Sequence, residues 1–372
     1  MKAQVAILRC PDYDTALVSE ALRRALDLLG GITSFIKPAS RVLVKPNLLL
    51  ATSPESGVTT HPEVVRQVVR VLKEIDCKVY LGDGPSALAN QLENVANVYA
   101  QSGMEAVARE EGVELVQFNK RRWRGKFPLA AFLDECDYLI NIPKFKTHEL
   151  TILSGAIKNL FGLVSGTYKV ELHKNYARPE DFSRILVDVY AQVKPALTIV
   201  DGIVAMEGDG PGTGGKLRHC GLLLAGADAV ALDSILAVIM GLKPEDILTT
   251  REAIARGMGV ADLASIDIKG EKIEGLMQES FLLPTSSWTK KLPAPLVKCV
   301  KDFVRFYPKI IPAKCTRCQT CVKICPQKVM RLQSGRIVID YKGCISCFCC
   351  QESCPEAAIK IKKSLLAKII GL

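Results

Sequence analysis

The sequence predicts an α/β domain with a mainly parallel sheet and helices on both faces, followed by a small α+β domain. Three observations support this prediction. Short apolar runs alternate with amphipathic stretches over about the first 285 residues, several of these runs are apolar throughout, and nine of the 14 cysteines fall between Cys315 and Cys354. Continuous apolar strands that alternate with helices are typical of parallel sheets covered on both faces.

Each strand predicted in the first part is a short β-prone run that ends in polar residues or glycine. The segments between these runs have the apolar period of helices. We predict strands at Val5–Arg9, Arg41–Lys45, Lys78–Gly82, Glu114–Phe118, Tyr138–Ile142, Leu197–Asp201, Gly221–Ala225 and Ile266–Lys269. We predict helices at Asp14–Leu29, Pro62–Ile75, Gln91–Gly112, Pro179–Val193 and Ala229–Met240.

The alternation weakens before the cysteine-rich segment, where prolines become frequent. We place the α/β domain at residues 1–285, a linker at 286–306, the cysteine-rich domain at 307–363 and a tail at 364–372. In the linker region, Leu296–Tyr307 has the pattern of a short amphipathic helix. Such a helix packs on a neighbouring domain more often than it lies on a membrane surface, so we expect a domain contact.

Two runs of cysteines in the second part carry the same motif. CTRCQTCVKICP begins at Cys315 and CISCFCCQESCP begins at Cys344, and each contains C-x2-C-x2-C-x3-C-P. Three closely spaced thiolates cap three corners of a [4Fe–4S] cube, and the fourth cysteine of each run ligates the other cluster. The spacing therefore predicts two [4Fe–4S] clusters in a domain of the bacterial-ferredoxin type. The expected ligand sets are Cys315, Cys318, Cys321 and Cys354 for one cluster, and Cys344, Cys347, Cys350 and Cys325 for the other.

Short β-prone runs flank these motifs, and we predict strands at Val329–Leu332, Arg336–Ile339 and Ala358–Ile361. Disulfides are not expected in a chain without a secretion signal. Zinc is not expected either, because zinc prefers four ligands from CxxC pairs and these two longer runs hold eight thiolates. Cys349 is a ninth thiol beside the second motif, and we interpret it as a packing residue. The remaining cysteines are expected to be buried structural thiols: Cys10, Cys77, Cys136, Cys220 and Cys299.

The composition is that of a soluble globular protein. Apolar residues make up 48% and charged residues 24%. We find no run of about 18 apolar residues that would span a membrane. The N-terminal MKAQVAILRC lacks the apolar core of a signal peptide. We therefore expect a cytoplasmic location, without a membrane span or peripheral membrane contact.

The net charge of +10 is concentrated in the second domain, where residues 307–372 hold 12 Lys and Arg against three Asp and Glu. These cations would offset the charge of anionic clusters, attract an acidic redox partner protein, or serve solubility alone, and the sequence leaves these three readings open. The segment lacks the interleaved aromatic residues of a single-strand binder, so no nucleic acid partner is expected.

Polar residues follow four predicted strands of the first domain. The segments are Lys45-Pro46-Asn47, Asp83-Gly84-Pro85-Ser86, Ile142–His148, and Asp201-Gly202 with the glycine-rich loop Glu207–Gly215. In a parallel sheet these ends meet at one rim, where ligands bind. Ammonium groups and backbone N–H groups together bind carboxylate or phosphate, so an anionic small molecule is the expected ligand. The candidate binding residues here are Lys45, Asn47, Lys144, Thr147 and Asp201.

The segment Leu150–Gly166 reads as a helix of small and apolar residues that also carries Lys158 and Asn159. A lysine in such a helix is costly unless it is paired or reaches a ligand. We therefore add Asn159 to the binding residues and propose Lys146, His148 and Lys158 as catalytic. All four histidines are expected at junctions or loops, with His148 and His173 the strongest candidates.

Several of these segments resemble the family described as domain of unknown function 362. The matching segments are KPNLL at Lys45, IPKFKTHELT at Ile142, GAIKNLFGLVSG at Gly155, and VDGIVAMEGDGPGTGG with LLAGADAVALDSILAVIMG. The similarity spans about residues 5–270. Members often carry an appended two-cluster ferredoxin domain and are described as iron–sulfur centre proteins. The resemblance implies architecture and electron chemistry but names no substrate. The motif positions it brings forward are Lys45, Asn47, Lys144, Lys146, Thr147, His148, Lys158, Asn159 and Asp201.

The leading functional hypothesis is a cytoplasmic oxidoreductase of anaerobic or microaerobic metabolism. Electrons would pass from a donor through the two clusters to an anionic substrate or cofactor bound by Lys45, Lys144 and Lys158. His148 would exchange a proton, because its ordinary pKa lies near neutrality. One alternative is an electron carrier whose α/β domain docks a partner enzyme. The other is a redox-sensing, metal-binding or cofactor-binding module with His148 and His173 as ligands.

Overall fold

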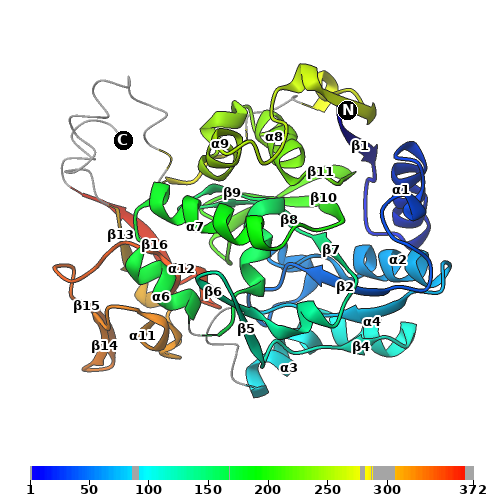
Figure 1. Cartoon of the computed structure of the whole chain (residues 1–372). Coiled ribbons are helices and arrows are strands. Elements are labelled where there is room, and N and C mark those ends of the chain that lie inside the picture. Colours follow the sequence, from blue (N-terminus) through cyan, green and yellow to red (C-terminus); the bar gives the residue numbers. More distant parts are fainter. Residues whose placement is uncertain are drawn as a thin grey trace.

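The computed structural model describes residues 2–85, 92–166, 168–276, 281–285, 287 and 306–364. A ten-stranded sheet organises the first domain, with the strand order β12-β1-β11-β10-β7-β2-β3-β4, and β8 and β9 attached beside β10 (Figure 1). The strands are β1 (Ala3–Arg9), β2 (Arg41–Pro46), β3 (Lys78–Leu81), β4 (Glu114–Leu115), β7 (Tyr138–Ile142), β8 (Lys144–His148), β9 (Ile152–Ser154), β10 (Leu197–Gly208), β11 (Gly215–Gly226) and β12 (Ile266–Gly270).

The sheet is mostly parallel, as predicted. The strands β10, β7, β2, β3 and β4 pair in parallel, whereas β11 is antiparallel to both β10 and β1. Three predicted strands differ from the structure by three residues or more. The fourth ends at Leu115 instead of Phe118. The strand β10 continues past Asp201 to Gly208, and β11 begins at Gly215 instead of Gly221, because the two pair in a long hairpin.

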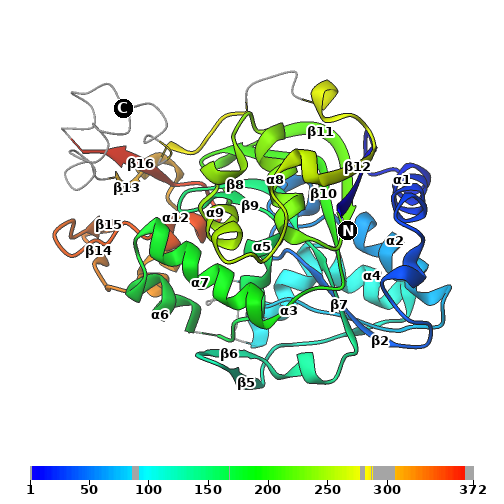
Figure 2. The same cartoon turned by 45° about the horizontal axis from the view of Figure 1, so that its top comes forward.

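Helices cover both faces of the sheet and create two separate apolar cores. One core lies under α1, α2, α3 and α4, and the other under α5, α7, α8 and α9 (Figure 2). The helices are α1 (Thr15–Leu28), α2 (Pro62–Lys73), α3 (Leu92–Gln101), α4 (Met104–Glu111), α5 (Ala156–Asn159), α6 (Tyr168–Asn175), α7 (Pro179–Gln192), α8 (Ala229–Ile239) and α9 (Leu248–Ala255).

Three expectations for this domain are wrong. The single helix predicted for Gln91–Gly112 is split into α3 and α4 at Gly103, whose φ of 77° is left-handed. The helix predicted for Leu150–Gly166 is the strand β9 followed by the short α5 and a 3-10 turn. His173 and His219 lie in α6 and β11, instead of in loops.

The second domain contains two strand pairs and two short helices. The helices begin 29 residues apart, and left-handed residues recur at the same spacing: Arg317 with Ser346, Gln319 with Phe348, and Lys328 with Ala357. The two cysteine runs thus share a backbone conformation as well as a sequence. The elements of the second domain are β13 (Phe306–Ile310), α11 (Thr320–Ile324), β14 (Met330–Gln333), β15 (Arg336–Ile339), α12 (Cys349–Glu352) and β16 (Ile359–Lys363). The first domain also contains a separate hairpin of β5 (Arg121–Arg124) and β6 (Phe127–Ala130).

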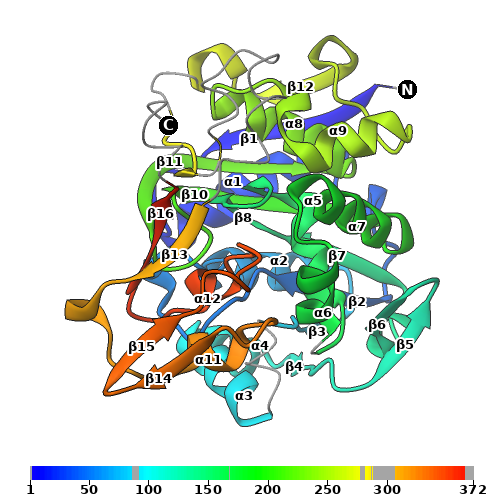
Figure 3. The same cartoon turned by 90° about the vertical axis from the view of Figure 1, so that its left-hand side faces the viewer.

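The second domain packs against the α/β domain through α12 and the glycine-rich loop between β10 and β11. Gln351 Nε2 donates to the Asp209 carbonyl at 2.8 Å, and Thr213 Oγ1 donates to the Cys354 carbonyl at 2.7 Å. Figure 3 shows α12 facing the α/β domain, with the β14–β15 hairpin further out. The predicted linker helix and the tail beyond Ser364 lie outside the described residues, apart from Phe306 and Tyr307, which belong to β13. No helix of the described part is long and apolar enough to cross a membrane.

Candidate site between the two domains

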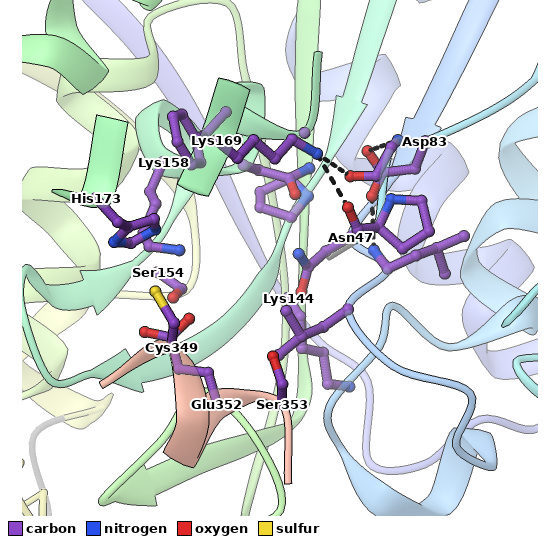
Figure 4. Close-up of a pocket in the computed structure, with 18 of the residues that line it drawn as sticks. Asn47, Asp83, Lys144, Ser154, Lys158, Lys169, His173, Cys349, Glu352 and Ser353 are labelled. Atoms are coloured by element: carbon purple, nitrogen blue, oxygen red, sulfur yellow. Dashed lines mark hydrogen bonds between the residues drawn. The ribbon is translucent and has the colours of Figure 1, made fainter. Parts of the chain in front are cut away.

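A cavity of about 100 Å³ lies where the α/β domain meets α11 and α12, with room for several water molecules or one small polar ligand. Both domains supply its walls. In Figure 4 Lys158, Lys169 and His173 lie above the cavity, and Cys349, Glu352 and Ser353 lie below it. The sheet therefore places the predicted rim residues next to the cysteine-rich domain.

Lys45 and Asp83 form a buried ion pair at the ends of the neighbouring strands β2 and β3. Lys45 Nζ lies 2.6 Å from Asp83 Oδ1, and both side chains are buried. Burial lowers the pKa of Lys45, and the Asp83 carboxylate partly offsets this shift. A Cβ at Gly162 would lie 2.2 Å from Asp83 Oδ1, so only glycine fits there. Asp83 lines the cavity, whereas Lys45 does not. Lys45 supports Asp83 from behind.

Lys144 is held by a second buried cluster behind the cavity. Its Nζ donates to Asp201 Oδ2 at 2.8 Å and to the Tyr13 hydroxyl at 2.6 Å. Asp201 also accepts from the Tyr13 hydroxyl and from the backbone N–H of His61. Burial lowers the pKa of Lys144, while Asp201 raises it. The ammonium group is therefore paired, and Asp201 acts on Lys144 instead of facing the cavity.

Lys146 and Thr147 do not line the cavity. Lys146 Nζ donates to the Val58 carbonyl at 2.6 Å. Burial first, and Lys158 second, hold the pKa of Lys146 well below its ordinary value. Thr147 Oγ1 donates to the Met206 carbonyl, at 3.4 Å. Thr147 thus links β8 to β10, Lys146 links β8 to the loop that contains Val58, and their predicted roles stay predictions.

His148 connects the two domains. Its Nδ1 accepts the backbone N–H of Leu150 at 3.1 Å and that of Thr151 at 3.3 Å, so the ring proton is on Nε2. Nε2 lies 3.2 Å from Glu352 Oε1, off the line of a good hydrogen bond. Burial and Lys158 lower the pKa of His148 to about 4. His148 is thus neutral at pH 7 and contacts Glu352 from behind the cavity wall.

Glu352 is a buried carboxylate contributed by the second domain. Burial alone would raise its pKa, but His148, Lys158 and His173 together lower that pKa to about 2. Burial lowers the pKa of His173 to about 4. Because both imidazoles are neutral at pH 7, Lys158 is the cation that opposes this carboxylate. The cavity therefore holds a permanent negative charge next to a lysine.

Lys158 and Lys169 are the two lysines of the cavity that lack a carboxylate within hydrogen-bond distance. No hydrogen bond or ion pair joins Lys158 to a side chain of the described residues, and burial lowers its pKa. Lys169 Nζ donates to the carbonyls of Gly84 and Pro85. Burial is the main cause that lowers the pKa of Lys169 to about 7. Asp83 attracts the ammonium group and raises this pKa, whereas nearby Lys45 and Lys158 repel it and lower the pKa. Both ammonium groups can accept an anion without breaking an existing ion pair.

Other polar atoms of the cavity lack hydrogen-bond partners within the described part of the chain. They are Asn47 Oδ1, Ser154 Oγ, Asn159 Oδ1 and His173 Nδ1. The amide group of Asn159 is fixed by the chain, since its Nδ2 donates to Asn141 Oδ1 at 2.8 Å. Buried polar groups are normally satisfied by protein, water or ligand. The cavity thus presents hydrogen-bond acceptors as well as cations.

The structure brings together part of the predicted site. Asn47, Lys144, Lys158 and Asn159 line the cavity, whereas Lys45, Lys146, Thr147, His148 and Asp201 stand behind it. The glycine-rich loop contributes nothing to the lining. A Cβ at Gly212 would lie 2.5 Å from the Glu352 carbonyl, so the loop needs glycine for close contact with α12. Its expected role in anion binding is replaced by a role in domain contact.

Sequence reasoning missed the contribution of the second domain, namely Cys349, Glu352 and Ser353. A signal for it exists in the repeat. Gln351-Glu352-Ser353 occupies the positions that Val322-Lys323-Ile324 occupies in the first motif, and all three polar residues are buried. Three buried polar residues on a short helix indicate a polar contact surface. Lys169 and Asp83 also line the cavity and were not among the predicted binding residues.

Cysteines of each proposed ligand set lie near one another in the structure. Cys325, Cys344, Cys347 and Cys350 line one small cavity together. Burial raises the pKa of Cys321 to about 11, and the next contributions come from Cys318, Cys354 and Cys315. The cysteines of the described residues form no disulfide. Eight thiols in two groups of four fit two cubane clusters, for which they would supply the thiolate ligands.

Outside the two cysteine runs, no group of three His, Cys, Asp or Glu side chains that could hold a single metal ion is found among the described residues. His148 and His173 therefore do not form a mononuclear site with a third such ligand in this part of the chain. Cys349 stands apart from the two sets. Its thiol donates toward Cys347, which raises the pKa of Cys349, and its side chain also lines the interdomain cavity.

Comparisons with known proteins match two separate parts of the chain. The family model described as a domain of unknown function (DUF362) matches residues 42–238, and the model of a 4Fe-4S dicluster domain matches residues 307–355. The resemblance seen in the sequence is thereby confirmed. No solved structure matches the chain.

Similar proteins fall into two groups. A thylakoid-associated protein from Synechocystis sp. is 33% identical over 256 residues, which are 67% of this chain and 78% of the relative. Subunit I of an NADH-quinone oxidoreductase from Pelobacter propionicus is 35% identical over 63 residues, 13% of this chain and 34% of that protein. The pyruvate synthase subunit PorD from Methanocaldococcus jannaschii is 34% identical over 55 residues, 14% of this chain and 64% of that protein.

Proposed function

This chain belongs to the family described as domain of unknown function 362, and it carries a 4Fe–4S dicluster domain; on this basis we propose that it is an oxidoreductase. Electrons pass through two [4Fe–4S] clusters to an anionic small molecule in the interdomain cavity. One observation carries the proposal. The cavity is walled on one side by lysines of the α/β domain and on the other by α12, which carries the proposed ligand Cys350 and ends two residues before Cys354.

The chemistry of the cavity indicates the class of ligand. Lys158 lacks a hydrogen-bonded or ion-paired partner among the described residues, and Lys169 contacts only carbonyl oxygens, so both favour a carboxylate or phosphate. Asn47 Oδ1 and Asn159 Oδ1 are available to accept hydrogen bonds from a ligand, and Glu352 excludes a second negative charge nearby. We therefore propose a small acid whose reduced form also carries a hydrogen-bond donor, a hydroxyl or amino group.

The electron balance is simple. Two [4Fe–4S] clusters held by the eight cysteines would supply one electron each, and two electrons with two protons convert an oxo group to a hydroxyl. Lys158 and Lys169 hold ammonium protons at the cavity, and Lys158 is the proposed donor. His148 acts through Glu352 as a positioning residue, since it does not line the cavity.

The test is anaerobic reoxidation of the protein. Reconstituted protein is reduced with dithionite, freed of excess reductant, and mixed with a panel of small 2-oxo acids, unsaturated acids and their hydroxy counterparts. The proposal expects at least one oxidised acid to restore the oxidised cluster spectrum. Lys158→Met should slow that reaction roughly 10- to 100-fold, the value of a lost charge-assisted hydrogen bond. Lys194→Met, at an exposed lysine of the α/β domain, is the matched control.

An electron carrier without a substrate would give a different result. No small acid would reoxidise the clusters, whereas a protein acceptor would, and Lys158→Met would behave as the parent protein. The proposed location is the cytoplasm and the proposed setting anaerobic metabolism. Membrane fractionation tests this location, because the Synechocystis relative is named as thylakoid-associated.

A further inference from the structure

The two cysteine runs share a backbone conformation but differ in exposure. Cys318 and Cys347 are matched positions in the repeat, and both follow a left-handed residue. Cys318 is exposed, whereas Cys347 is 8% exposed. The first run therefore holds a proposed cluster ligand at the surface, while the matched ligand of the second run is buried.

The charges around the two runs differ in the same way. Lys314, Arg317 and Lys323 are exposed around Cys318, and the matched positions of the second run are Gly343, Ser346 and Glu352. No ion pair joins any of these three cations to a carboxylate of the described residues. The surface around this exposed cluster ligand is therefore cationic, and no ion pair within the described residues neutralises it.

We propose that this surface, defined by Lys314, Arg317, Lys323 and Cys318, is where electrons enter, and that it docks an electron-donor protein with an acidic face. The donor loses one electron and the cluster of Cys315, Cys318, Cys321 and Cys354 gains it, and no bond or proton changes. The buried second run then faces the cavity, where electrons leave. The proposal rests on the clusters of the proposed function but not on the identity of the cavity ligand.

Charge complementarity gives the proposal a measurable signature. Oppositely charged faces accelerate encounter, and dissolved salt screens this attraction over about 10 Å at 0.1 M. Figure 1 shows α11 and the β14–β15 hairpin at the outer edge of the molecule, away from the α/β sheet. A donor can therefore reach this surface without displacing the α/β domain.

The experiment is stopped-flow reduction of the full-length, cluster-loaded protein by a pre-reduced acidic ferredoxin at increasing NaCl concentration. The second-order rate constant should fall on the order of 10-fold between low and high salt. The triple variant Lys314→Glu, Arg317→Glu and Lys323→Glu should lose at least that factor at low salt and show a flat or inverted salt dependence. The control triple variant, Arg109→Glu, Lys194→Glu and Lys272→Glu, makes the same change of charge on exposed residues of the α/β domain and should keep most of the rate.

Two results would overturn the entry surface. One is a parent rate constant that does not fall with salt, which needs no variant and so does not depend on folding. The other is equal slowing by both triple variants, which would assign the effect to net charge. Iron content and visible absorbance establish that each variant is loaded. Failure of every acid to reoxidise the protein would overturn the cavity chemistry and leave this rate measurement unaffected.

Discussion

Lys144 and Lys158 line the same cavity in opposite electrostatic settings. Lys144 is bound to Asp201 at 2.8 Å and to the Tyr13 hydroxyl, so it completes a buried ion pair. Lys158 has no such partner within the described residues and faces the cavity. The first arrangement is structural and the second is that of a ligand site, although both residues carry the same charged group.

Methionine at these two positions should separate the roles. Lys144→Met leaves the Asp201 carboxylate buried and unpaired, so it should lower the free energy of unfolding by about 3 to 5 kcal/mol. Lys158→Met should lower that free energy by less, because Lys158 lies beyond ion-pair distance of Glu352 and the saved desolvation offsets part of the lost attraction. Chemical denaturation under anaerobic conditions measures both. Equal losses of stability in the two variants would contradict the distinction.

Lys169 should make anion binding depend on pH. Its pKa is lowered to about 7, chiefly by burial, so the ammonium form dominates below pH 7 and is lost above it. Affinity for a carboxylate that does not itself titrate in this range should therefore fall as the pH rises from 6 to 8.

Lys169→Met should flatten this pH profile, which calorimetric or fluorescence titration would measure. His148 and His173, both lowered to a pKa of about 4, stay neutral throughout. A profile that keeps its shape in Lys169→Met would assign the titration to another group.

At the scale of elements, short apolar runs that alternate with helical segments predicted most of the sheet. The reason is that parallel strands covered by helices on both faces are apolar on both sides. This pattern failed at Leu150–Gly166. Small and apolar residues there suit a helix, but the His148 ring accepts two backbone N–H groups of the following turn and β9 pairs with β8. His148 and β8 lie outside the segment, so the composition of the segment alone does not reveal these contacts.

The glycine-rich loop gives an element-scale prediction. A Cβ at Gly212 would meet the Glu352 carbonyl at 2.5 Å, a backbone atom that cannot easily move. Gly212→Ala should therefore lower the free energy of unfolding by about 1 to 3 kcal/mol through overpacking at the domain contact. Gly275→Ala is the control, because nothing lies within 4 Å of its Cβ position. Thermal denaturation in which Gly212→Ala behaves like the control would contradict this contact.

Crossed ligation makes a second prediction for the cysteine runs. Cys354→Ala should remove the cluster of the first run and leave about four irons per chain. Adding Cys315→Ala should remove no further iron, because both residues bind the same cluster. Loss of all iron in the double variant would show uncrossed ligation. Cys349→Ala should keep the iron of the parent protein, and iron assays with EPR of the reduced variants measure all three.

At the scale of the whole molecule, the two domains share one site. The sequence predicted each domain separately, since the cysteine spacing is local and the strand pattern is periodic. It could not place Glu352 against His148, which is 204 residues away in the chain. Only the packing of α12 on the α/β domain brings the lysines, the acceptor oxygens and the cluster-binding segment around one cavity.

All of this depends on the clusters being present in the intact chain. The most direct measurement is the iron and acid-labile sulfide content of anaerobically purified full-length protein, with EPR after reduction. We expect about eight irons and eight sulfides per chain and a signal from two interacting reduced clusters. Colourless protein, zinc in place of iron, or four irons or fewer would contradict the account.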